Sequence, residues 1–109
     1  RHAVEEAFTS IREAEESTWR ALVLKLCGLE LAEICEALKQ HGVGSVPTAS
    51  RRTQRGASLL IDHLVRFHFA RECTTQEEAE EMVRKDTDVI GAAILTYAKH
   101  HEPDAEAPR

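Results

Sequence analysis

Three ionisable residues occupy positions where the helical periodicity of the chain predicts apolar side chains. Glu15, His68 and Asp86 each occupy the centre of an apolar stripe in a different segment. A buried carboxylate beside a histidine could transfer protons or act as a pH switch, because burial and opposite charge both move pKa values. The alternative, which we favour, gives each residue a structural role: Asp86 caps a helix after a kink, Glu15 reaches water, and His68 is hydrogen-bonded in the core.

A second group of residues has the composition of a polyanion-binding surface. Residues 46–71 carry five arginines and one aspartate, a net charge of +4, in a chain whose net charge is −5. Clustered arginines and hydroxyl groups bind phosphates, and arginine and glutamine also read base edges. The candidate nucleic-acid contacts are Thr48, Ser50, Arg51, Arg52, Gln54 and Arg55.

The basic segment and the segment before it resemble a helix-turn-helix motif in outline. "GLELAEICEALKQHG" predicts a first helix, and "VPTASRRTQR" predicts the start of a second one that would enter the major groove of DNA. The spacing departs from that motif, since eight residues separate Leu38 from Pro47 where the motif has a turn of three or four. The other interpretation is an exposed polar loop and helix start.

The order of a short helix, a long helix and another short helix also resembles the histone fold in outline. The polar stretch "TASRRTQRG" in the long helix suits that fold badly.

The other reactive side chains form no motif for catalysis or metal binding. Histidines and a cysteine that could hold a metal are His63, His68, Cys73, His100 and His101. Helical residues five apart point about 140° away from each other, so His63 and His68 do not share a face. The sequence contains no GxSxG, no HExxH and no glycine-rich phosphate loop. We therefore expect no enzymatic activity, no cofactor and no metal.

Composition indicates an ordinary globular protein. Of the 109 residues, 42% are hydrophobic and 30% are charged, which predicts a single domain. Three cysteines at irregular spacing indicate free thiols and a cytoplasmic location. No apolar run approaches the ~20 residues that span a bilayer.

Hydrophobic periodicity predicts helices from end to end, and no segment alternates as a strand does. We expect an all-α bundle of four or five helices, with one domain over residues 1–101 and a flexible tail over residues 102–109. The first helix follows a stripe from Val4 to Leu26 and ends near Gly28, and the second ends at Gly42.

The two remaining helices have clear start signals. The third begins near Pro47 with Ser45 as its cap, and Gly56 leaves open a bend or a break. The last begins at a Thr75–Glu78 capping box and runs to about residue 101.

The third helix carries more apolar surface than one small core needs, since its second half is apolar around roughly 200° of its circumference. We expect a contact surface for a protein partner, most simply a second copy of the chain. Its candidate residues are Leu59, Leu60, Leu64, Phe67 and Phe69. The sequence thus favours a helical interaction module, either a homodimer or an adaptor or regulatory subunit. The alternative is a helix-turn-helix DNA-binding regulator that uses residues 46–71.

Overall fold

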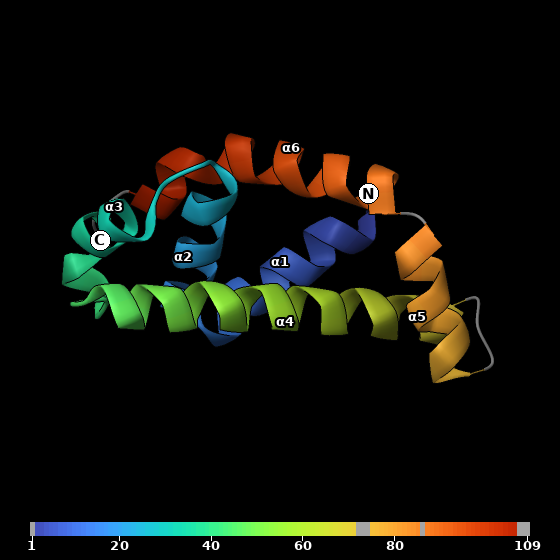
Figure 1. Ribbon diagram of the computed structural model, residues 1–109. Helices are drawn as coiled ribbons and strands as arrows, with labels where there is room; N and C mark the ends of the chain where they lie inside the picture. Colours follow the sequence, from blue (N-terminus) through green and yellow to red (C-terminus); the bar gives the residue numbers. More distant parts are fainter. Residues whose placement is uncertain (1, 72–74, 86, 107–109) are drawn as a thin grey trace.

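The computed structural model describes residues 2–71, 75–85 and 87–106, and within these residues it contains six α-helices, one short 3-10 helix and no strand. The elongated molecule measures 43 × 23 × 22 Å. In Figure 1, α4 runs along one long side and α6 along the opposite side, with α1 and α2 between them. The elements are α1 (His2–Ala14), α2 (Glu16–Leu26), α3 (Leu31–Ala37), η1 (Lys39–His41), α4 (Val46–Arg71), α5 (Gln76–Lys85) and α6 (Thr87–Glu106).

The all-α prediction is confirmed, but the helix count is higher because two expected helices are interrupted. The stripe from Val4 to Leu26 is divided at Glu15, whose backbone lies at φ −146° and ψ 81°. All seven residues from Thr18 to Leu24 are buried. Seven consecutive residues cover every side of a helix, so α2 needs neighbours all round. The break at Glu15 lets α1 pack against α2.

The expected last helix is likewise divided into α5 and α6, on either side of residue 86, which lies outside the described residues. Residues 102–106, expected to begin a flexible tail, instead form the end of α6, and Ala105 is buried. Arg20 explains this order, because its Nη1 donates to the carbonyl oxygens of Asp104 at 2.8 Å and Ala105 at 2.7 Å. A buried guanidinium from α2 thus satisfies carbonyl groups that a helix end leaves without partners.

The start signals and the left-handed glycines are confirmed, but the second helix ends earlier than expected, because α3 stops at Ala37 and only η1 reaches Gly42. The Ser45 hydroxyl accepts a hydrogen bond from the backbone N–H of Thr48 at 3.3 Å, at the start of α4. Thr75 and Glu78 form both bonds of the capping box, at 3.2 and 3.1 Å. Gly28 and Gly42 have φ values of +98° and +85°, in the left-handed region that favours glycine.

The core is centred on α2, against which α1, α3, α4 and α6 all pack. The Nε1 of Trp19 donates to the hydroxyl of Tyr97 at 3.0 Å, and the rings of Phe8 and Tyr97 stack at 4.0 Å. These contacts join α1, α2 and α6.

Helix α4 is continuous through Gly56, so the break that the sequence left open does not occur. Gly56 is buried where α4 meets α2. A Cβ atom at this position would lie only 2.9 Å from the Cβ of Leu22. Glycine here permits close approach of two helices rather than interrupting one.

Candidate functional site

The face of α4 that we expected to bind a partner is largely covered by the chain itself. Leu60 and Leu64 are buried, and Leu59 and Phe67 are half-buried. Helices α1 and α2 both pack against α4. The expected contact surface therefore needs correction, because Leu60 and Leu64 belong to the core. The side chain of Phe69 lies outside the described residues.

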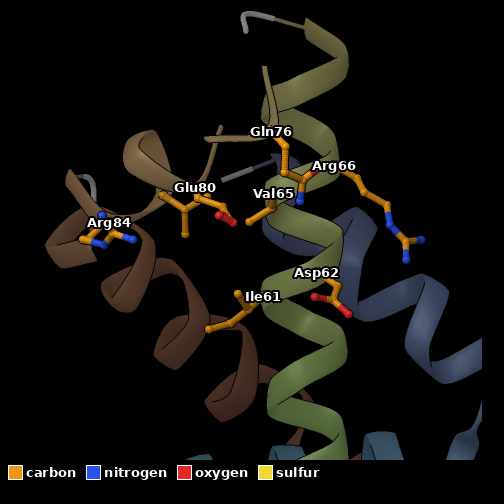
Figure 2. Close-up of a pocket in the computed structure, with 8 residues that line it drawn as sticks. Ile61, Asp62, Val65, Arg66, Gln76, Glu80 and Arg84 are labelled. Carbon is orange, nitrogen blue, oxygen red and sulfur yellow. The ribbon is translucent and has the colours of Figure 1, made fainter. Parts of the chain in front are cut away.

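On the neighbouring side of α4, Val65 is buried but Ile61 is not. Ile61 is 54% exposed, although it is a large aliphatic residue. It lies at a cleft of about 610 Å³ between α4 and α5. The apolar residues of the cleft are Ile61 and Val65 from α4 and Val83 from α5. Figure 2 shows Ile61 directed toward the side of α4 on which α5 lies, and Glu80 of α5 directed toward Val65.

The rim of this cleft carries charges of both signs. Asp62 and Arg66 come from α4, where Figure 2 shows Arg66 extending away from α5, and Glu80 and Arg84 come from α5. Arg84 also pairs with Glu81 at 2.6 Å on the exposed side of α5. An aliphatic floor with a mixed-charge rim suits the apolar face of another helix. It offers no nucleophile with an adjacent base, and no group of three metal-ligating side chains occurs in the described part of the chain.

The basic segment forms the first half of α4, and none of its six candidate residues is buried. Four of them, Thr48, Arg51, Arg52 and Arg55, are spaced to share one side of the helix. Ser50 and Gln54 lie on another side, where the Gln54 amide donates to the Ser50 hydroxyl at 3.3 Å. Helix α3 ends at Ala37, and η1 and a loop precede Val46. The connection is therefore longer than the turn of a helix-turn-helix motif.

One arginine of this segment is engaged within the molecule. Arg55 forms a bidentate ion pair with Glu15, in which its Nε donates to Oε1 at 2.7 Å and its Nη2 donates to Oε2. These hydrogen bonds lower the pKa of Glu15, against a smaller opposite effect of partial burial, and a hydrogen bond from Thr18 lowers it further. The pair joins the α1–α2 break to α4.

This pair separates Glu15 from the other two members of the expected proton-transfer cluster. His68 lies 13 residues beyond Arg55 on the same continuous helix, a rise of about 20 Å. The Glu15 carboxylate therefore lies far from the His68 backbone. The side chain of His68 and all of Asp86 lie outside the described residues, so a pairing between those two stays a prediction.

The sequence interpretation missed two apolar residues that α6 exposes, Val89 (71%) and Leu95 (46%). The sequence predicted a single last helix, from Thr75 to about residue 101. Because the helices are separate, α6 has its own stripe, in which Ile90, Ile94 and Tyr97 face inward. No local signal separates Val89 from Ile90, because adjacent helical residues lie only about 100° apart and can both fall within one apolar face.

Comparison with protein-family models, with curated proteins and with solved structures finds no match to this chain. No helix in the described residues combines the length and the apolar character that crossing a bilayer requires. Helix α4 thus carries two candidate contact surfaces: the cleft beside Ile61, and an arginine face formed by Arg51, Arg52 and Arg55.

Proposed function

We propose that this protein is a non-enzymatic helical interaction module that binds a protein partner in the cleft between α4 and α5. The observation that carries the proposal is the exposure of Ile61, whose side chain is more exposed than those of the other aliphatic residues of the cleft. Leaving half of an isoleucine side chain in water forgoes about 1 kcal/mol of burial free energy. A concave site of this kind is a typical place for a partner to recover that energy.

The partner surface that fits best is one face of an amphipathic helix. Aliphatic side chains at helical spacing would contact Ile61, Val65 and Val83. Flanking charges of either sign would find an opposite charge at the cleft, because α4 and α5 each contribute one acid and one arginine to its lining. Such complementarity supplies orientation, while the apolar contact supplies affinity.

Site-specific photocrosslinking tests this proposal. A photoreactive amino acid replaces Ile61 in the full chain, which is expressed in the cells that naturally make it. The control places the same amino acid at Val46, which is 44% exposed on α4 but outside the cleft. We expect a discrete protein adduct from position 61 and none from position 46. Absence of an adduct at position 61 would refute the use of the cleft, and the adduct's mass identifies the partner.

The arginine face of α4 supports nucleic-acid binding as a second candidate function. Residues 46–61 contain three arginines and no acidic residue, and Arg51 is exposed at the start of α4. Titration with random-sequence duplex DNA at increasing salt tests this function, because phosphate contacts make affinity fall steeply with salt. The joint substitution Arg51→Gln and Arg52→Gln should weaken binding. No binding by the unaltered protein at low salt would remove this candidate.

A further inference from the structure

The molecule exposes a second apolar surface that is convex rather than concave. Val89 and Leu95 are exposed on α6, and Ala92 between them is exposed as well. The three residues follow one another at a spacing of three, which makes them neighbours on the helix surface. We call this row the α6 ridge. The described residues hold four exposed large apolar side chains, and three of these lie at the cleft or on the ridge: Ile61, Val89 and Leu95.

The charges at both surfaces permit the approach of a second copy. The whole chain has a net charge of −5, so much of its surface repels another copy. The cleft rim is locally balanced, with two acids and two arginines. The ridge is balanced too, because Asp88 precedes Val89 and Lys99 lies one turn beyond Leu95, both of them exposed. Because neither the cleft nor the ridge carries a net charge, their contact between two copies would not place like charges together.

We propose that the occupant of the cleft is a second copy of this chain, which inserts its α6 ridge between α4 and α5. The inference rests on the proposed function and names the partner. The apolar face of one helix can occupy a groove between two others, a common mode of helix recognition. The exchange is reciprocal and forms a two-fold dimer, in which each copy supplies one ridge and one cleft.

Sedimentation equilibrium of the purified full chain over a wide concentration range, with two single variants and their mixture, tests the dimer. Ile61→Asp places a charge in the cleft, and Val89→Lys places one on the ridge. Both positions are exposed, so each variant should retain the circular dichroism and melting temperature of a folded monomer. We expect each variant to dimerise at least about tenfold more weakly than the unaltered protein, because a charge would be buried against an apolar surface. The matched control Val46→Asp, outside both surfaces, should dimerise as the unaltered protein does.

Mixing the two variants identifies the pairing. A mixed dimer contains one unaltered ridge in one unaltered cleft, and its other contact brings the introduced lysine of one copy against the introduced aspartate of the other. We therefore expect the mixture to regain dimers that neither variant forms alone. A monomeric unaltered protein would overturn the proposal, and so would undiminished dimerisation by either variant alone or a mixture that stays monomeric. If the unaltered chain is monomeric but position 61 crosslinks another protein in cells, the interaction module stands and the self-association fails.

Discussion

Around α2, helices α1, α3, α4 and α6 enclose the large side chains, and even the buried Arg20 has its hydrogen bonds satisfied. Between α4 and α5 and along α6, by contrast, Ile61, Val89 and Leu95 remain in solvent. We therefore expect the first region to supply most of the folding free energy. The second leaves apolar surface uncovered in a single copy, which is why we assign binding to it.

Removing the Arg20 side chain, which caps the end of α6, should give the largest loss of stability. The Arg20 side chain also pairs with Glu16 at 3.0 Å and is almost fully buried. Arg20→Met leaves the carbonyl oxygens of Asp104 and Ala105 without this donor. We expect a loss of about 3 kcal/mol in urea-unfolding free energy, together with faster hydrogen exchange near the end of α6.

The matched control for this substitution is Arg84→Met, because Arg84 pairs with Glu81 in solvent at the rim of the cleft. An exposed ion pair contributes little to stability. The unfolding free energy should therefore stay within experimental error. Equal losses for Arg20→Met and Arg84→Met would contradict the contrast between the two regions.

Two glycine substitutions should shift stability in opposite directions. At Gly56 an added methyl group would lie against Leu22 of α2, whereas at Gly91 in α6 it would meet no atom within 4 Å. We expect Gly56→Ala to lower the unfolding free energy by about 1–2 kcal/mol through overpacking. Gly91→Ala should raise it by about 0.5–1 kcal/mol through helix propensity. Thermal melts of both variants check the signs, and stabilisation by Gly56→Ala would show that α2 and α4 are less tightly packed.

The smallest expected effect concerns the exposed ion pair of Glu15 and Arg55, and it depends on pH. Because Arg55 lowers the pKa of Glu15 in the folded state, the pair stabilises the fold above the ordinary glutamate pKa of about 4.3. That contribution is lost as the pH falls through the lowered pKa. The urea midpoint of Glu15→Gln should lie below that of the unaltered protein at neutral pH and approach it in acid.

Arg55→Gln provides the control for this pH dependence. It should reproduce the effect of Glu15→Gln, and combining the two substitutions should add nothing further. A difference between Glu15→Gln and the unaltered protein that persists at low pH would show that the carboxylate has a role other than its ion pair.

Local signals were sufficient to predict the helical class and most helix ends. The caps at Ser45 and Thr75, and the left-handed glycines 28 and 42, involve only residues close in sequence. The break at Glu15 could not be predicted in this way. It depends on how α2 is surrounded, and apolar residues on both sides of the break fit a single stripe.

The candidate site was only partly predictable for the same reason. Helical periodicity identified α4 as the helix with surplus apolar surface, but it could not distinguish Leu60 and Leu64 from Ile61. Which of them is covered depends on the positions of α1, α2 and α5. The Trp19–Tyr97 hydrogen bond spans 78 residues, and no local pattern indicates a contact of that range.

The central claim is that Ile61 serves association and contributes little to the fold of one copy. The most direct test measures urea midpoints of the unaltered protein and of Ile61→Asp over a range of protein concentrations. Association stabilises only the form that associates, and more so as concentration rises. We predict coincident midpoints at the lowest concentrations and a higher midpoint for the unaltered protein at high concentration. A large difference that is the same at every concentration would contradict the claim, because it would place Ile61 in the core.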